Sequence, residues 1–402
     1  MVHGAAPDRT DLGTSFAEAA PKVIRVGLAA GVIGLGGALA ASMVQGGIAR
    51  FFQSYLVSFS FLLTITLGAL FFVILQHLVR AGWSVVIRRL AEAAAMNLPL
   101  LFVFFLPLLA MMGPLYEWAR PEAVAHDPLI QAKTSYLNIP FFIGRWIVFF
   151  AVWILVARYF WSRSTAQDQS GDVGLTKSME RSAGPIMVLF AVVLNFASFD
   201  LLMSLKPQWY STIFGVYIFS GGVVGFFAAL PIVVGLLQRD GRLRGVTDEH
   251  WHDFGKLLFA FVVFWAYIAF SQFMLIWYAN IPEETSWFLP RTRGGWLPVS
   301  WLLLFGHFLG PFFLLLPRTV KRSPKLLVPI AVWLLVMHYV DLYWLVLPTF
   351  STEGPPVVAA DLLCPIGLTG FYLAAAAHRL RHRPLVPVKD PRLAESLSFE
   401  NA

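Results

Sequence analysis

The residues best placed to do chemistry are a few polar and ionisable side chains within long apolar segments. In the second half of the chain they are Gln272, His307, His338 and Asp341. His338 and Asp341 are three residues apart, so they share one face if their segment is helical. A histidine next to a carboxylate can exchange protons near neutral pH, which suits a proton relay. The four residues are therefore candidates for a proton path. A buried structural network, or a haem b held between His307 and His338, remain as alternatives.

A second group lies in the first half of the chain and contains Arg145, Asp200 and Asn195. At the helical rise of about 1.5 Å per residue, Arg145 lies about 10 Å and Asp200 about 8 Å below the same end of two consecutive segments. Charges at one level on antiparallel neighbours should pair, because leaving either alone in lipid is costly. We expect an ion pair, with a proton or quinone site as the functional interpretation. Asn195 and Asn138 are expected to complete the network.

Each of these side chains lies in one of ten apolar stretches of about the length that crosses a bilayer. With 58% hydrophobic and 13% charged residues, the chain leaves little material for a soluble domain. Backbone groups in lipid must be satisfied internally, so such runs are interpreted as helices rather than as barrel strands. The sequence predicts an all-α membrane protein. The predicted spans are 26–44, 55–78, 96–116, 138–161, 183–205, 210–238, 257–280, 296–317, 326–348 and 357–377.

The order of the polar residues suggests an internal repeat. Helices two to five and helices six to nine form two groups of four, each with a basic or imidazole residue on its third helix and an acid on its fourth. The residues are Arg145 and Asp200 in one group, and His307 and Asp341 in the other. We therefore expect two four-helix bundles flanked by helices one and ten. The expected segments are an N-terminal tail at 1–25, a membrane domain at 26–377 with bundles at 55–205 and 210–348, and a C-terminal tail at 378–402.

The charges predict the orientation. Most of the 30 Lys and Arg residues fall in alternate loops and in the two tails, so the positive-inside rule places both termini in the cytoplasm. The net charge of +7 is thus a topology signal, and nucleic acid is not an expected partner. The small residues around Ala38-Leu39-Ala40 resemble a signal cleavage site, but the long apolar run is interpreted as a retained helix.

Several kinds of centre are excluded by composition. Cys364 is the only cysteine, so there is no internal disulfide, no thiolate-held iron–sulfur cluster and no C-x-x-C-H haem attachment. No phosphate-binding glycine motif opens a helix. Any electron transfer is therefore expected in partners or through a quinone between helices. Of the remaining candidates, His77 is interpreted as an interfacial residue, and Asp361, about 6 Å inside its helix, as reaching water.

Several long strings carry a family resemblance. They are LNFASFDLLMSL at 194–205, PQWYSTIFG at 207–215, GKLLFAF at 255–261, FWAYIAFSQ at 264–272 and IWYANIPEET at 276–285. Together they resemble the NrfD/PsrC-like family of integral membrane subunits, in particular the ActF-type subunits of bacterial alternative complex III. The similarity covers nearly the whole spanning region and is strongest in helices five to seven.

The resemblance implies ten helices in two four-helix bundles, within a quinol:cytochrome c (or other acceptor) oxidoreductase of the bacterial inner membrane. It implies partners as well: a sister NrfD-like subunit credited with the quinol site, and multihaem cytochrome c and iron–sulfur subunits on the outer face. No cofactor is expected in this chain itself, while menaquinone or another quinone stays open as a ligand beside lipid. The expected work is docking the redox subunits and conducting protons.

Two other classes remain open. A secondary transporter often has helices broken at mid-membrane, and Pro107, Pro231, Pro311 and Pro365 could provide breaks. Such a protein would purify alone or as a homo-oligomer, whereas a redox subunit should purify with haem proteins. A purely structural assembly subunit would keep turnover of the complex when its polar clusters are neutralised.

Overall fold

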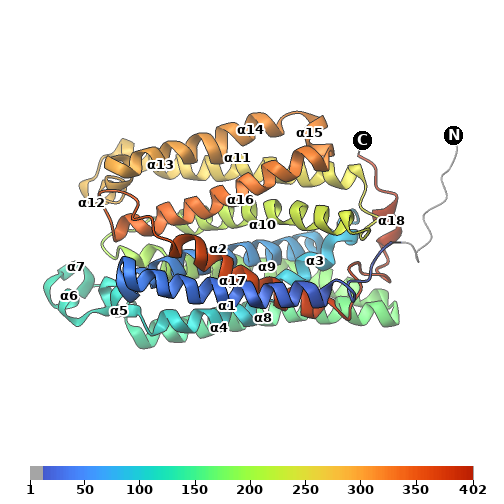
Figure 1. Ribbon diagram of the computed structural model, residues 1–402, viewed down its shortest axis with the longest axis horizontal. Coiled ribbons are helices and arrows are strands. Elements are labelled where there is room, and N and C mark those ends of the chain that lie inside the picture. Colours follow the sequence, from blue (N-terminus) through green and yellow to red (C-terminus); the bar gives the residue numbers. More distant parts are fainter. Residues whose placement is uncertain (1–11, 402) are drawn as a thin grey trace.

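The computed structural model describes residues 12–401, and every regular element in that range is a helix. Ten helices or helix groups are long and apolar enough to cross a membrane, and they lie roughly parallel to one another (Figure 1). The expected all-α membrane fold is confirmed. The spanning elements are α1 (Ala20–Gln45), α2 (Gly47–Leu78), α3 with α4 (Val85–Ala95, Leu98–Leu109), α8 (Ile139–Ser170), α9 (Val173–Leu201), α10 (Phe214–Arg239), α11 (Asp248–Ala279), α13, η6 and α14 (Leu297–Leu302, Leu303–Leu309, Gly310–Leu315), α16 (Pro324–Val346) and α17 (Ala360–Leu380).

Short helices cover the two ends. Because the spans are even in number, residues 12–19 and 381–401 lie at the same end, which we call the terminal face (Figure 1). The other end, which we call the opposite face, carries a projection that follows α4. The short elements of the opposite face are α5 (Met112–Leu115), α6 (Pro121–His126), α7 (Pro128–Gln131) and α12 (Pro282–Thr285), and those of the terminal face are α15 (Arg318–Arg322) and α18 (Leu393–Leu397).

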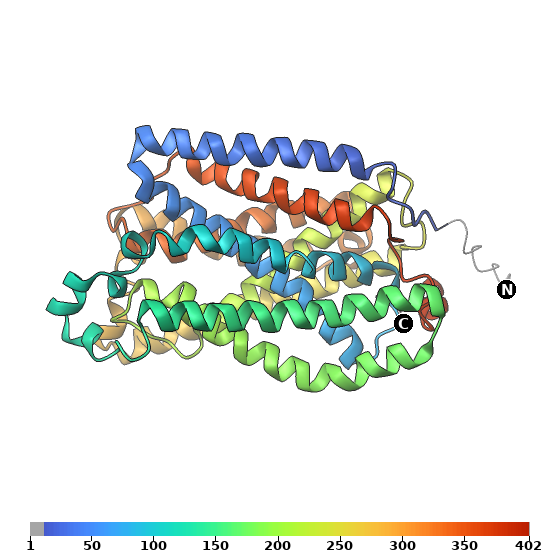
Figure 2. The same ribbon diagram turned by 90° about the horizontal axis from the view of Figure 1, so that it is seen from below.

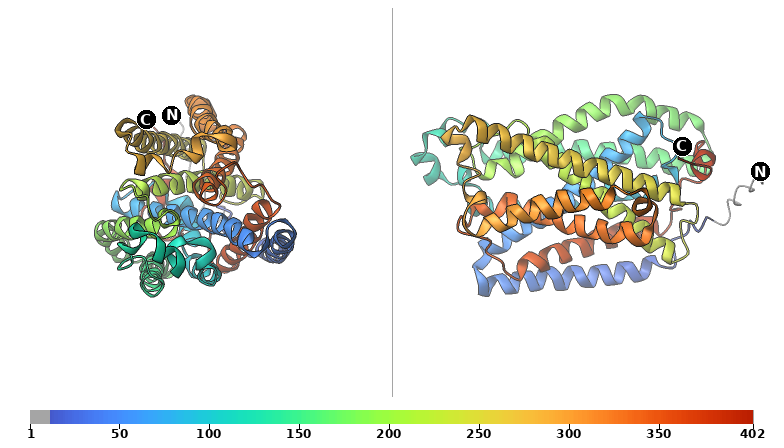
Figure 3. Two further views of the ribbon diagram at one scale, coloured as in Figure 1. Left: turned by 90° about the vertical axis from the view of Figure 1, so that its left-hand side faces the viewer. Right: turned by 90° about the horizontal axis from the view of Figure 1, so that it is seen from above.

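The spans form two four-helix bundles, as expected. In the first bundle α2, α3–α4, α8 and α9 each pack on the next, and α9 closes the ring on α2. In the second bundle α10, α11, the α13–η6–α14 group and α16 form the same kind of ring. The bundles meet mainly along α2 and α10, with α2 also touching α16 (Figure 3). α2 is therefore the central helix of the molecule, and its polar side chains lie next to helices of both bundles.

The first and last spanning helices form a tight pair beside α2 (Figure 2). Glycines line the seam between them: a Cβ atom at Gly27 would lie 2.5 Å from the carbonyl oxygen of Gly370, and one at Gly34 would lie 2.6 Å from the Cα of Gly367. Small residues let helix backbones approach closely in a membrane, where packing rather than water drives association. α1 and α17 are therefore joined by backbone proximity.

The third span differs from its predicted position. It was expected at 96–116, but α3 and α4 cover 85–109 and a non-helical step at Met96 and Asn97 separates them. The predicted span leaves out Arg88, Arg89 and Glu92, because charged residues favour a loop over a membrane helix. These side chains are buried within α3 instead.

Buried ion pairs explain how α3 carries those charges. Arg89 contacts Glu92 at 3.1 Å and Asp168 of α8 at 2.8 Å, while Arg88 contacts Glu92 at 3.5 Å and also pairs with Asp390 near the C-terminus. Charges inside a protein are tolerated when each has an opposite partner. The network makes α3 part of the core and binds the end of the chain to the first bundle.

The segment after α17 packs under the terminal face of the first bundle. The Val388 amide donates to Asp168, and the Ser396 hydroxyl donates to the Trp83 carbonyl at 2.5 Å. The Leu385 amide donates to the Thr14 carbonyl at 2.8 Å and joins the two ends of the described chain. Of the expected N-terminal tail, residues 1–11 lie outside the described residues, and α1 already begins at Ala20.

Candidate functional site

Asp341 of α16 is the centre of the second bundle's polar site. Its side chain is buried, with the residue 1% exposed, and neutral groups hold both oxygens. The Tyr217 hydroxyl of α10 donates to Oδ1 at 2.5 Å, and the Trp265 indole of α11 donates to Oδ2 at 3.2 Å. Within residues 12–401 Asp341 forms no salt bridge. This carboxyl group therefore has hydrogen-bond donors but no cation.

His338 lies one helical turn deeper on α16 and is equally buried. Its Nε2 atom is 2.9 Å from the Thr64 hydroxyl of α2, while its Nδ1 atom has no hydrogen-bond partner in the described part of the chain. α10 approaches closely because it carries glycine here: a Cβ atom at Gly221 would lie 3.3 Å from His338 Nδ1 and 3.6 Å from Asp341 Oδ2. The two side chains thus line one face of α16, as their spacing predicts.

His307 reaches the same site from η6, which is a π-helical turn. Pro311 cannot donate to the carbonyl of residue 307, and the Gly310 amide bonds to the Phe305 carbonyl, five residues back. The His307 imidazole packs on Trp265, with ring centroids 4.0 Å apart and planes at 33°. Both of its nitrogens lack partners among the described residues. Trp265 therefore contacts His307 with its ring and Asp341 with its N–H.

Gln272 lies apart from these residues. It is buried on α11, nearer the opposite face than Trp265, and its amide oxygen is 3.4 Å from the Ser211 hydroxyl. The structure thus gathers His307, His338 and Asp341 around Trp265 and Gly221, and places Gln272 with Ser211.

Sequence reasoning missed the donors of this site, Tyr217, Trp265 and Thr64. A general signal exists, because a buried tyrosine or tryptophan needs a partner for its polar end. The 14 Trp and 11 Tyr of the chain make that signal too common to single out these two.

The first bundle contains the expected ion pair. Arg145 of α8 donates from Nε to Asp200 Oδ2 at 2.6 Å and from Nη2 to Oδ1 at 3.1 Å, a two-point contact. Its third donor reaches the Tyr136 carbonyl at 2.8 Å, and its guanidinium lies over the Tyr136 and Phe141 rings. The Arg145 guanidinium and the Asp200 carboxylate thus neutralise each other, which suits a structural role.

The expected extension of this pair through Asn195 and Asn138 is wrong. Asn195 donates to the Ala191 carbonyl of its own helix at 2.9 Å and lies against Gly215. It precedes Asp200 by five residues, about 500° of rotation, so the two lie on different faces of α9. Asn138 caps α8 by accepting from the Phe141 amide at 2.9 Å.

Two other interpretations also need correction. Asp361 does not reach water: it is 5% exposed and accepts from both Arg50 and Ser54 at 2.7 Å. Arg50 lies outside the predicted span 55–78 but within α2, which begins eight residues earlier. His77, in the last turn of α2, does not face the surroundings of the protein: it is 2% exposed and stacks on Phe160 with ring centroids 5.1 Å apart.

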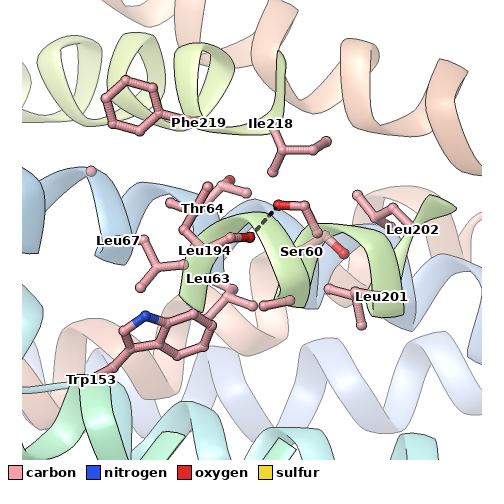
Figure 4. A pocket seen from close by; sticks show the side chains of 13 residues that line it. Ser60, Leu63, Thr64, Leu67, Trp153, Leu194, Leu201, Leu202, Ile218 and Phe219 are labelled. Carbon is pink, nitrogen blue, oxygen red and sulfur yellow. Dashed lines mark hydrogen bonds between the residues drawn. The ribbon is translucent and has the colours of Figure 1, made fainter. Parts of the chain in front are cut away.

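A small cavity lies between α2, α8, α9 and α10 (Figure 4). About 20 Å³ of it is open to the centre of a water molecule, enough for roughly one water and far below a typical small-molecule site. Figure 4 shows Thr64 and Ser60 of α2 on one side and Trp153 of α8 below them. Thr64 therefore contacts both this cavity and His338. A quinone ring does not fit this cavity.

The amino-acid sequence matches no family model, and it matches no curated protein. The clearest chemical difference between the two bundles is that Asp200 pairs with a cation, whereas Asp341 accepts only from neutral donors.

Proposed function

We propose that this multi-pass membrane protein conducts protons through its second bundle, as an integral subunit of a quinol-oxidising respiratory complex. The resemblance of residues 194–285 supports membership in such a complex. The resemblance also supports a bacterial inner membrane location, and the distribution of Lys and Arg supports a cytoplasmic terminal face. Multihaem cytochrome c and iron–sulfur subunits would then dock on the opposite face, with a sister subunit beside this chain in the membrane.

The observation that carries the proton proposal is the carboxyl group of Asp341. A buried carboxylate without a cation costs several kcal/mol, so such a group needs another source of positive charge. Tyr217 and Trp265 supply only neutral donors. A proton on Asp341 itself would neutralise the carboxyl group in place of a cation. Such a proton can be taken up and released. Asp200 does not need a proton for this purpose, because Arg145 already neutralises its charge.

The two histidines extend the site. Buried polar atoms in native structures nearly always have a partner, so unpartnered nitrogens call for ordered water or a transient proton. His307 has two such nitrogens and His338 has one. We assign Asp341 the role of proton holder and His338 and His307 the role of relays. Tyr217, Trp265 and Thr64 are positioning residues that fix the orientation of these three groups.

The test is the number of protons released per electron by the intact complex in liposomes. Asp341→Asn keeps the shape and both contacts, because its amide oxygen can accept from the Trp265 N–H and its amide nitrogen can donate to the Tyr217 hydroxyl. The amide cannot carry a proton, so the proton-to-electron ratio should fall while assembly persists. Tyr116→Phe is the matched control, because it removes one buried neutral hydrogen bond, to the Leu201 carbonyl, in the first bundle. An unchanged ratio in Asp341→Asn, with a lower yield of intact complex, would support a structural subunit instead.

A secondary transporter is the second candidate, because two spans are interrupted. The π-helical turn η6 interrupts the third helix of the second bundle, and the step between α3 and α4 interrupts the second helix of the first. Paired binding-site breaks should occupy corresponding positions in the two repeats, and these do not. Purification decides: a transporter isolates alone or with copies of itself, whereas the proposed subunit isolates with haem proteins.

A further inference from the structure

A second buried polar cluster leads from the opposite face toward His338. It begins with Asp361, at the start of α17, which Arg50 and Ser54 of α2 contact at 2.7 Å. The Tyr339 hydroxyl of α16 donates to the Asp361 carbonyl at 2.6 Å, and the Ser58 hydroxyl lies 3.5 Å from that of Tyr339. We call Arg50, Ser54, Ser58, Tyr339 and Asp361 the Asp361 cluster.

The cluster follows α2 and α16 inward. Along α2, Arg50, Ser54 and Ser58 are spaced by four residues, so they form one row of about 6 Å steps that starts at the opposite face. Along α16, Tyr339 is the neighbour of His338. The cluster therefore ends within about two helical turns of the Thr64–His338 contact, and on the same two helices.

One apolar side chain lies between the two polar groups. Phe61 is three residues from Ser58 and three from Thr64, and it is buried. Its ring packs against the His338 imidazole, with centroids 5.7 Å apart, and edge-on against the Tyr339 ring at 5.6 Å. With Phe61 in this position, no hydrogen bond among the described residues joins Tyr339 to His338.

The Asp361 cluster holds more polar groups than an ion pair needs. Arg50 and Asp361 already satisfy each other's charge. The hydroxyls of Ser58 and Tyr339 lie deeper and do not contact either charged group directly, since Tyr339 bonds to the backbone of Asp361 and Ser58 to the backbone of Ser54. These inner hydroxyls can pass a proton by exchanging one O–H bond for another.

We propose that Phe61 is the gate of a proton route that joins the His338–Asp341 site to the opposite face through the Asp361 cluster. The inference rests on the proposed proton function and adds the route and its barrier. When the Phe61 ring swings to another rotamer, a water molecule can bridge Tyr339 and His338. Each transfer breaks one N–H or O–H bond and forms another, so no oxidant or reductant is needed.

The test measures proton entry into liposomes that contain the purified full-length chain, driven by a potassium diffusion potential and followed by an internal pH dye. Phe61→Ala should accelerate proton entry about tenfold or more. Phe59→Ala is the matched control, because it removes the same side chain from the same helix. Phe59 is also buried, and it packs on Phe105 of the first bundle. The rate of this control should stay at the wild-type value.

Two further variants locate the route. Adding Tyr339→Phe to Phe61→Ala removes the inner hydroxyl of the Asp361 cluster that lies on α16 and should return the rate most of the way to wild type. If Phe61→Ala does not fold, Phe61→Val makes a smaller opening. The Phe61→Val variant should still be faster than the Phe59 control, and adding Tyr339→Phe should again slow it. Equal rates in the Phe61 and Phe59 variants, or no effect of Tyr339→Phe, overturn the gate.

The gate and the proposed function can fail separately. Adding Asp341→Asn to Phe61→Ala should abolish the fast proton entry. If the fast entry survives Asp341→Asn, protons bypass the carboxyl group and the proposed function is wrong. If Asp341→Asn lowers the proton-to-electron ratio of the complex while Phe61→Ala leaves proton entry unchanged, the function stands and the gate is wrong.

Discussion

In the first bundle a carboxylate meets a guanidinium, and in the second a carboxyl group at the corresponding helix meets only neutral donors. Asp200 has two bonds from Arg145, whereas Asp341 has one from Tyr217 and one from Trp265. Both acids belong to the fourth helix of their bundle. The acid on the fourth helix therefore has a compensating cation in the first bundle and only neutral donors in the second.

The third helices explain the difference. Arg145 is long enough to reach across to Asp200, but His307 at the corresponding helix is shorter, and the Trp265 ring packs against it. The indole takes the hydrogen-bonding position next to Asp341 that a cation takes next to Asp200. A compensated pair stabilises a bundle, whereas an uncompensated carboxyl group in a membrane points to function.

The largest expected difference is in stability. Asp200→Asn leaves the buried Arg145 without a counter-charge and should lower the free energy of unfolding by about 3–5 kcal/mol. Asp341→Asn removes no partner's counter-charge and should lower it by at most about 1.5 kcal/mol. Denaturant titration of both variants in one detergent gives the comparison, and similar losses would show that the two acids are not held differently.

A double substitution sharpens the same point. Arg145→Met combined with Asp200→Leu replaces the ion pair with apolar groups, which often leaves stability unchanged or improved. The double variant should regain most of the roughly 3–5 kcal/mol that Asp200→Asn loses. The same titration measures it. A double variant as unstable as the single one would mean that the first bundle needs the pair's geometry and not only its charge balance.

A smaller effect is expected at the donor to Asp341. Tyr217→Phe removes one neutral hydrogen bond and should lower the free energy of unfolding by about 0.5–1.5 kcal/mol. Tyr55→Phe, which removes a bond to the Phe104 carbonyl at 2.8 Å, should give a similar loss. The proton-to-electron ratio separates them, because only Tyr217 contacts the proposed proton holder. Equal ratios in the two variants would argue against a positioning role for Tyr217.

The smallest effect is expected at a carboxylate outside the membrane spans. The Gln208 amide donates to Asp127 at 2.9 Å and, with the Leu129 and Ile130 amides, holds the pKa of Asp127 below its ordinary value of 3.8. A pKa that is lowered by folding stabilises the folded state when the pH is above the ordinary pKa. This contribution is lost as the pH falls through the folded-state pKa. Gln208→Leu should raise the pKa of Asp127, which carboxyl carbon NMR can follow. No upward shift would contradict the assignment of Gln208 as the main cause.

The ten spans and the Arg145–Asp200 pair could be predicted because apolar length and depth along a helix are local properties of the sequence. α3 could not, because a charge counts as exposed until its partner is known, and Asp390, one of the two partners of Arg88, lies 302 residues away. The role of Trp265 was hidden for a related reason. Which face of α11 turns toward Asp341 depends on how the helices rotate in the bundle, and a uniformly apolar helix gives no signal for that rotation.

The glycine seam between α1 and α17 also has a consequence for the order of synthesis. Eight spans separate α1 from α17 in the chain, so the face of α1 that carries Gly27 and Gly34 stays without its main partner until both bundles have been synthesised. Chains fold from the N-terminus as they emerge, and contacts of the largest sequence separation close last. The two bundles can therefore form before this outer pair closes, and a ribosome that stalls before α17 would leave α1 in contact with α2 but without its main partner.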